Sequence, residues 1–146
     1  MRGRRIGNVL TTGATQETVQ PRVLVADDDK DILRLLSQRL THRGYQVIPA
    51  STGPEALSLV FEELPDAAVF DGIMPGIEGH EICARMRADN RTAAIPVVLL
   101  TAKAADADHR EATDAGVDAY ILKPFRIEQL DDKLRDLLAS ARERRP

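Results

Sequence analysis

The chain has 146 residues, of which 43% are hydrophobic and 29% are charged, and its formal net charge is −3. This length suits one domain with a hydrophobic core. No apolar run is long enough to span a membrane, and the N-terminus lacks the apolar segment of a secretory signal. The single cysteine excludes an internal disulfide. These features fit a cytoplasmic protein with no membrane partner.

Positive charge is concentrated at the two ends of the chain. Residues 1–22 and 142–146 together carry +5, whereas the body between them carries −8. The first 21 residues also lack apolar periodicity. We therefore predict a disordered N-terminal arm over 1–21, a folded domain over 22–141 and a basic tail over 142–146. Because no aromatic residues that could stack on bases accompany the arginines, we do not expect direct binding to nucleic acid.

Apolar residues alternate between short continuous runs and segments of helical period. The runs predict strands over 22–26, 45–49, 67–70, 95–100 and 117–122. The periodic segments predict helices that follow these strands, over 30–43 after an N-cap at Asp29, from 53 to about 64, from 80 to about 89, from about 106 to 115 and over 127–141. The expected apolar face of the first helix comprises Ile32, Leu33, Leu35, Leu36 and Leu40.

This strand–helix alternation, repeated five times, predicts an α/β fold. Strands that are apolar along their whole length are buried on both faces, which implies a parallel sheet covered by helices. We predict a flavodoxin-like (βα)5 doubly wound sheet with strand order 2-1-3-4-5, and Pro49 places strand two at an edge. That order brings the carboxyl ends of strands one and three together, at a switch point where such sheets bind ligands.

Polar side chains stand at the carboxyl ends of four predicted strands: Asp27 and Asp28, Asp71, Thr101 and Lys123. Two carboxylates about 4 Å apart repel by roughly 4 kcal/mol at an effective dielectric constant near 20. Such a cluster either takes up protons or recruits a cation. Oxygen ligands favour a hard ion, so the sequence predicts a site for Mg²⁺, or Mn²⁺, with a loop carbonyl after Asp71 as a further ligand.

Asp71 is then placed to act as a nucleophile toward a phosphoryl group and to form an aspartyl phosphate. Lys123 offers a mobile positive charge and Thr101 a hydroxyl donor for the phosphoryl oxygens. The peptide bond between Lys123 and Pro124 is a candidate for the cis form, which composition alone does not decide.

Taken together, the motifs at these strand ends resemble a response-regulator receiver domain of two-component signal transduction, of the chemotaxis-regulator type. The matching segments are Val23-Leu24-Val25-Ala26-Asp27-Asp28-Asp29, Val69-Phe70-Asp71-Gly72-Ile73-Met74-Pro75-Gly76, Leu100-Thr101-Ala102 and Tyr120-Ile121-Leu122-Lys123-Pro124-Phe125. They occur in the family's order and spacing across residues 22–141.

The resemblance implies that Asp71 accepts a phosphoryl group from a sensor histidine kinase or a phosphotransfer protein. It implies a Mg²⁺ ion held by the acidic cluster and the backbone carbonyl of Ile73. It also implies a cis Lys123-Pro124 bond, and a Tyr120 ring that moves with Thr101 as the face of helix four, strand five and helix five changes for a downstream protein target. A homodimer through this face is compatible with the resemblance.

Two positions are expected to set the lifetime of the phosphorylated form. Ile73 and Lys103 both lack a group that could orient an attacking water, so we predict slow self-hydrolysis. Three alternatives remain open. The chain can be the receiver part of a longer regulator with a separate output domain. It can be an Asp-nucleophile phosphatase, although Ile73 replaces the acid/base aspartate of that motif, or a nucleotide-binding flavodoxin-like protein, although no glycine-rich loop follows strand one.

Overall fold

The computed structural model describes residues 19–102 and 115–144. Within them the chain forms, in order, β1 (Arg22–Ala26), α1 (Lys30–His42), β2 (Gln46–Ala50), α2 (Gly53–Glu63), β3 (Ala67–Asp71), α3 (Gly79–Arg87), β4 (Val97–Thr101), β5 (Ala119–Leu122) and α5 (Ile127–Arg144). All neighbouring strands pair in parallel, in the order β2-β1-β3-β4-β5. The predicted fold and strand order are confirmed, and β2 is an edge strand as Pro49 indicated. The helix predicted over 106–115 lies outside the described residues except for Ala115.

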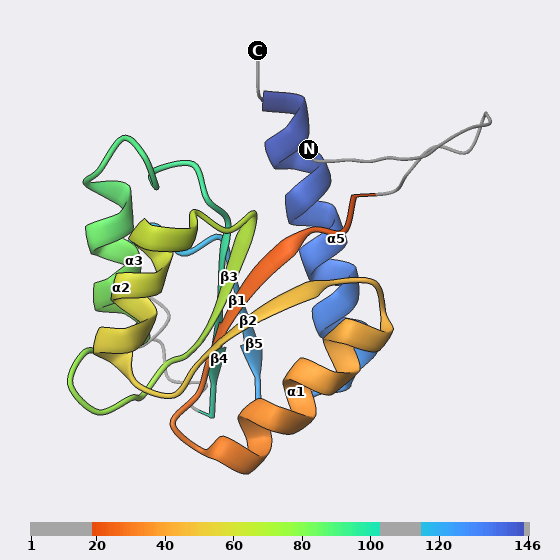
Figure 1. The fold of residues 1–146 in the computed structure, drawn as a ribbon. Coiled ribbons are helices and arrows are strands. Elements are labelled where there is room, and N and C mark those ends of the chain that lie inside the picture. The colour runs from red at the N-terminus through yellow and green to blue at the C-terminus, as the bar shows by residue number, and fades with distance from the viewer. Residues whose placement is uncertain (1–18, 103–114, 145–146) are drawn as a thin grey trace.

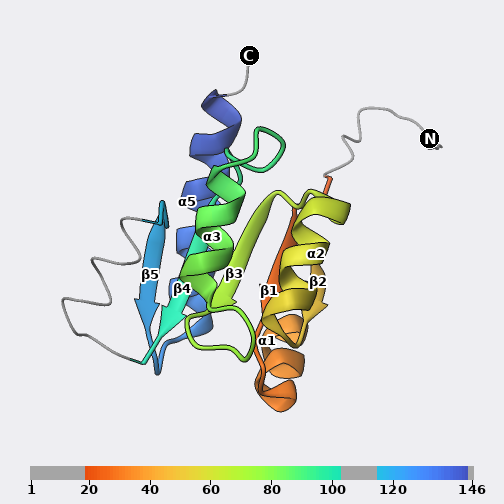
Figure 2. The same ribbon diagram turned by 90° about the vertical axis from the view of Figure 1, so that its left-hand side faces the viewer.

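Helices cover both faces of the sheet, with α1 and α5 on one side and α2 and α3 on the other (Figures 1 and 2). The strands alternate their side chains between these layers. In β1, Val23 and Val25 pack with α1 and α5, whereas Leu24 and Ala26 pack with α2 and α3. Burial on both faces explains why the strands read as continuous apolar runs. Among the described residues, no helix has the length and apolar composition that a membrane span needs.

Local signals fix where the helices begin. The Asp29 carboxylate caps α1 by accepting hydrogen bonds from the backbone N–H groups of Asp31 (3.0 Å) and Ile32 (3.2 Å). The Thr52 hydroxyl caps α2 by accepting a hydrogen bond from the Glu55 N–H (3.1 Å).

Several boundaries of helices and strands differ from the prediction by one to three residues. β2 is shifted by one residue, β4 and β5 begin two residues late, and α5 extends to Arg144.

The predicted apolar face of α1 is wrong at two of its five positions. Leu33, Leu36 and Leu40 are buried, but Ile32 is 41% exposed and Leu35 is 50% exposed. At 100° per residue, positions 33, 36 and 40 share one narrow stripe toward the sheet. Ile32 and Leu35 each precede a buried position and therefore lie on the flank of the helix.

Candidate functional site

The carboxyl edge of the sheet brings together the polar side chains predicted to converge. Asp27 follows β1 directly, Asp71 ends β3, and Lys123 follows β5. Backbone hydrogen bonds continue the sheet to these positions. The Asp27 N–H donates to the carbonyl of Ala50 (3.1 Å), and the Lys123 N–H donates to the carbonyl of Thr101 (2.8 Å). The side chains are therefore held on a rigid edge at the point where β1 and β3 adjoin.

Three carboxylates form a cluster at this edge. Asp27, Asp28 and Asp71 each offer one oxygen, and these oxygens all lie within 4.8 Å of one another. Their environments differ, because Asp27 is only 2% exposed, Asp71 is partly buried and Asp28 is exposed. The cluster thus combines a buried carboxylate, Asp27, with an exposed one, Asp28, so a cation can reach it from solvent.

Asp27 is the least satisfied member of the cluster. Its Oδ1 accepts a hydrogen bond from the Asp29 N–H (2.9 Å), but its buried Oδ2 has no hydrogen-bond partner among the described residues. Burial is the main cause that raises the pKa of the Asp27 carboxyl, and the Asp71 carboxylate raises it further. A buried oxygen without a partner is costly and suits a metal ion.

Lys123 is the cation that faces the cluster. Its Nζ donates to Oδ1 of Asp71 (3.2 Å) and lies 3.8 Å from Oδ2 of Asp27. The peptide bond that follows it, Lys123-Pro124, is cis. Among the described residues, one lysine against three carboxylates leaves two negative charges, which a divalent cation would balance. The all-oxygen donor set fits Mg²⁺ or Mn²⁺.

The remaining predicted residues surround this centre in different ways. Thr101 ends β4 and is partly buried, and its side chain shares a face of the sheet with Tyr120, which is 43% exposed in β5. Ile73 turns its side chain outward, with 59% of it exposed. Lys103 lies outside the described residues.

The loop that follows Asp71 is short and closed on itself. The Gly72 N–H donates to the carbonyl of Leu100 (2.8 Å), and the Gly79 N–H donates to the carbonyl of Gly72 (3.3 Å). Met74 is buried in the core beneath the loop, and Gly76 adopts a left-handed φ of +90° that other residues rarely take. The loop can therefore present a backbone carbonyl beside Asp71 from a fixed position.

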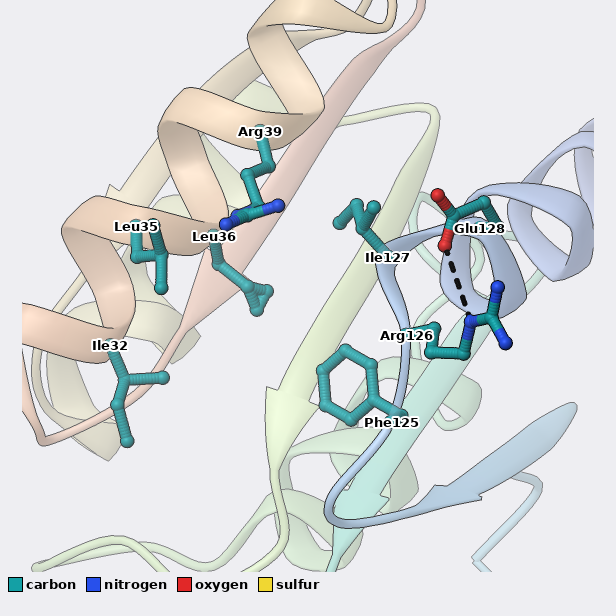
Figure 3. A pocket seen from close by; sticks show the side chains of 8 residues that line it. All are labelled: Ile32, Leu35, Leu36, Arg39, Phe125, Arg126, Ile127 and Glu128. Atoms are coloured by element: carbon teal, nitrogen blue, oxygen red, sulfur yellow. Dashed lines mark ion pairs between the residues drawn. The ribbon is translucent and has the colours of Figure 1, made fainter.

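An apolar groove lies beside the site on the α1 side of the sheet. It is a pocket of about 390 Å³ between α1 and the segment that joins β5 to α5. Figure 3 shows the pocket, with the Arg126–Glu128 ion pair at its rim. The residues that line the pocket are Ile32, Leu35, Leu36, Arg39, Phe125, Arg126, Ile127 and Glu128. Both walls continue directly from site residues, since α1 follows the Asp27-Asp28-Asp29 segment and Phe125 follows Lys123-Pro124.

Sequence reasoning missed this groove and two further packing contacts of the sheet, one at its carboxyl edge and one at its amino edge. One is the close packing of Gly53, at the start of α2, against the loop after Asp71. The other is Arg87 at the end of α3, whose guanidinium donates to the Asp118 carboxylate (2.8 Å) and to three backbone carbonyls. The exposed apolar flank of α1 was the one signal in the sequence that pointed to any of these features.

Comparison with known proteins places the chain among signalling regulators. Residues 23–135 match the family model of the response regulator receiver domain. The DNA-binding dual master transcriptional regulator RpaA of Synechocystis is 39% identical over 118 residues, which are 81% of this chain and 49% of RpaA. The transcriptional regulatory protein AfsQ1 of Streptomyces coelicolor is 38% identical over 118 residues, 81% of this chain and 51% of AfsQ1. The chain spans about half the length of these curated relatives.

A solved structure supports the same comparison. The CheY-like response regulator receiver domain protein of Methanospirillum hungatei superposes with a TM-score of 0.80 at 30% sequence identity. The match covers 86% of this chain and 98% of that one. The likeness therefore includes nearly the whole of a solved receiver domain.

Proposed function

We propose that Asp71 is the phosphoacceptor of this chain, which belongs to the response regulator receiver domain family, and that it takes a phosphoryl group from a histidine kinase, a phosphotransfer protein or a small phosphodonor. One observation carries the proposal: Asp71 lies within a cluster of three carboxylates and 3.2 Å from the Lys123 ammonium. The carboxylate cluster suits a divalent cation, and the Lys123 ammonium suits the oxygens of a phosphoryl group.

The metal fits the donors that the site provides. Mg²⁺ or Mn²⁺ would be held by Asp27, Asp28, Asp71 and the backbone carbonyl of Ile73, and the orphaned Oδ2 of Asp27 is the observation that supports this assignment. When bound, the ion neutralises charge on the phosphoryl oxygens. The chain itself supplies the nucleophile, the second positive charge and the hydroxyl donor.

The chemical step is a transfer to carboxylate oxygen. An oxygen of Asp71 attacks phosphorus, an O–P bond forms, and the P–N bond of the donor phosphohistidine breaks with its electron pair returning to the imidazole. With acetyl phosphate the P–O bond breaks and acetate leaves. Lys123 moves its ammonium from the Asp71 carboxylate to a phosphoryl oxygen, and the Thr101 hydroxyl donates to another. The chain is thus a switch that modifies itself and is not a classical enzyme.

Phosphorylation would act on the surface through Thr101 and Tyr120. Converting the Asp71 carboxylate into an acyl phosphate adds about one negative charge and three phosphoryl oxygens, which attract the Thr101 hydroxyl toward Asp71. Tyr120 shares its face of the sheet and is 43% exposed, so it has surface to bury when its ring turns inward. The new packing changes the face of β5 and α5, together with the helix predicted over 106–115, for a downstream protein target or a second copy of the chain.

The relatives bear on the form of the output. RpaA is named as a DNA-binding regulator, which contrasts with our expectation of no direct nucleic-acid contact. The matched residues cover about half of that relative, so we propose that any DNA contact belongs to a separate output domain. The receiver would then influence that domain through protein contacts alone.

The groove beside the site would receive the protein donor. Its exposed apolar residues Ile32 and Leu35 lie on the helix that follows the acidic segment, and Phe125 follows Lys123-Pro124 on the opposite wall. An apolar segment of the phosphodonor protein seated there would bring its phosphohistidine to the carboxyl edge. We expect Leu35→Glu to slow transfer from the protein donor at least tenfold and to leave labelling by acetyl phosphate unchanged. Equal transfer from the protein donor would exclude the groove as its docking site.

Asp71→Asn tests the acceptor. With Mg²⁺ and acetyl phosphate, the wild type should take up one labile phosphoryl group, as an acyl phosphate, and Asp71→Asn none. Asp132→Asn, which removes an exposed carboxylate on α5, is the matched control and should label normally. Undiminished labelling of Asp71→Asn refutes the assignment.

Ile73 and Lys103 are proposed to lengthen the life of the phosphorylated state, because neither orients a water for attack. Ile73→Asn and Lys103→Glu should each hasten loss of the phosphoryl group, measured as decay of labelled protein after removal of the donor. Decay at the wild-type rate in both variants would exclude this role.

A further inference from the structure

The loop after Asp71 rests on the beginning of α2, and a glycine on each side allows the close approach. A Cβ atom on Gly53 would lie 2.2 Å from the carbonyl oxygen of Ile77 and 2.9 Å from its nitrogen. A Cβ atom on Gly76 would lie 2.9 Å from Cδ of Pro54. No side chain can be added at Gly53 without displacing the backbone of the loop.

The α2 side of this contact is rigid. The Thr52 hydroxyl caps the helix by accepting from the Glu55 N–H (3.1 Å), and the Glu55 carboxylate accepts from the N–H of Ser51 (2.8 Å), one residue before the cap. The strand before it is tied to the site itself, since the carbonyl of Ala50 accepts from the Asp27 N–H (3.1 Å). The junction of β2 and α2 therefore adjoins the acidic cluster from two directions.

The loop side transmits position to the site. Residues 72–79 form a closed turn, anchored at one end where Gly72 bonds to Leu100 and at the other where Ile77 lies on Gly53. Ile73 lies between these anchors, and its carbonyl is the proposed backbone ligand of the metal. If Ile77 is displaced, one of the two fixed points of the loop moves. The segment between these points is too short to absorb that movement.

We propose that Gly53 is a positioning residue of the phosphoacceptor site: by admitting the Ile77 backbone, it sets where the loop presents the Ile73 carbonyl to a divalent cation. The inference rests on the proposed function for the identity of that ligand. Gly53 touches neither the cation nor Asp71 and acts through the loop. Supports of this kind commonly change metal affinity by 10- to 100-fold when altered.

Gly53→Ala is the direct test, with Mg²⁺ affinity measured by isothermal titration calorimetry on the full chain. We expect the Mg²⁺ dissociation constant to rise about tenfold, and the Mg²⁺ concentration that half-saturates labelling by acetyl phosphate to rise by the same factor. At saturating Mg²⁺ the labelling rate should return to within about twofold of wild type, because Asp71 and Lys123 are untouched. A folded Gly53→Ala variant with wild-type Mg²⁺ affinity overturns the proposal.

Gly44→Ala is the matched control for loss of stability. Gly44 has a φ of +100° and nothing within 4 Å of an added Cβ, so its substitution strains the backbone without a clash. It lies after α1, at the opposite end of the helix from the acidic segment. We expect a lower midpoint of unfolding and an unchanged Mg²⁺ dissociation constant, and a matching loss of Mg²⁺ affinity in Gly44→Ala would overturn the specific role of Gly53.

A wild-type measurement decides the matter if Gly53→Ala does not fold. Coupling is reciprocal, so Mg²⁺ should slow hydrogen exchange at the Glu55 and Ala56 amides, which bond to Thr52. Unchanged exchange there, together with slowed exchange in the 72–79 loop, overturns the inference and leaves the proposed function standing. Absence of both Mg²⁺ uptake and labelling in the wild type would instead refute the proposed function.

Discussion

Asp27→Asn provides a quantitative test of the electrostatics of the site. The substitution keeps the shape of the side chain and the acceptor for the Asp29 N–H, but it removes a buried negative charge from a cluster of three carboxylates. It also places an amide group where Oδ2 lies, 3.8 Å from the Lys123 ammonium, and it removes the repulsion from the carboxylates of Asp71 and Asp28. We therefore expect the metal-free variant to be more stable than the wild type.

The magnitude follows from the distances. At an effective dielectric constant near 20, the Lys123 ammonium 3.8 Å away attracts the Asp27 carboxylate by about 4 kcal/mol, and Asp71, no more than 4.8 Å away, repels it by at least about 3.5 kcal/mol. The exposed Asp28 adds about 1 kcal/mol of repulsion at the dielectric constant of water. These attractive and repulsive energies nearly cancel. The cost of burying the Asp27 carboxylate therefore decides whether the substitution raises or lowers the free energy of unfolding. We expect a gain of about 1–2 kcal/mol in the free energy of unfolding.

The effect depends on pH and on metal. The raised pKa of Asp27 means that the folded wild type holds this proton more tightly than the unfolded chain. The destabilisation is therefore full above the folded-state pKa and disappears as the pH falls through it, so the advantage of the variant should shrink in acid. Mg²⁺ at 100 times its dissociation constant would stabilise the wild type by about 2.7 kcal/mol and should help the variant less.

Urea unfolding followed by circular dichroism measures these differences, first in EDTA between pH 8 and pH 5 and then with Mg²⁺. Asp132→Asn controls for the change in net charge, and we expect it to shift stability by less than about 0.5 kcal/mol. A metal-free Asp27→Asn variant that is less stable than the wild type at pH 8 would refute the reasoning, because it would show that the attraction to Lys123 outweighs burial and repulsion.

Three further substitutions test other contacts. Lys123→Met removes the cation that competes for Asp71, so the Mg²⁺ dissociation constant should fall about tenfold in calorimetry; an unchanged or higher value would contradict the competition. Tyr45→Phe removes the 2.7 Å hydrogen bond to the buried Asp131 carboxylate and should cost about 1–3 kcal/mol in urea unfolding; a loss below about 0.5 kcal/mol would contradict it. Arg87→Lys cannot reach its four oxygen acceptors at once and should cost about 2–3 kcal/mol; stability equal to wild type would show that these bonds are dispensable.

Most of the site could be predicted from the sequence because its members stand at the ends of recognisable strands. Parallel strands end at one edge, so Asp27, Asp71 and Lys123 had to converge once the strand order was correct. The motifs around them also identified the receiver family, which the match over residues 23–135 confirms. Here the position of a residue along its strand is sufficient information, and no detail of side-chain packing is needed.

Contacts that no repeating pattern of the sequence marks could not be predicted. Gly53 and Ile77 touch through their backbones, and no pattern of apolar residues marks such a contact. Tyr45 was assigned to a strand, yet it precedes β2 and sends its hydroxyl to Asp131, 86 positions away. The exposure of Leu35 was also missed, because a helical period shows which residues share a face but not how wide the buried stripe is.

The two sides of the sheet make separable contributions to the carboxyl edge, and paired variants can distinguish them. The α1 side carries the apolar groove, so Leu35→Glu should slow transfer from a protein donor and leave acetyl phosphate labelling unaffected. The α2 side supports the acceptor loop, so Gly53→Ala should raise the Mg²⁺ requirement for both donors alike. Because Leu35 and Gly53 lie in opposite layers with no shared partner, the two effects should multiply in the double variant. A double variant that departs from this product by more than about threefold would show that donor docking and loop position are coupled through the edge itself.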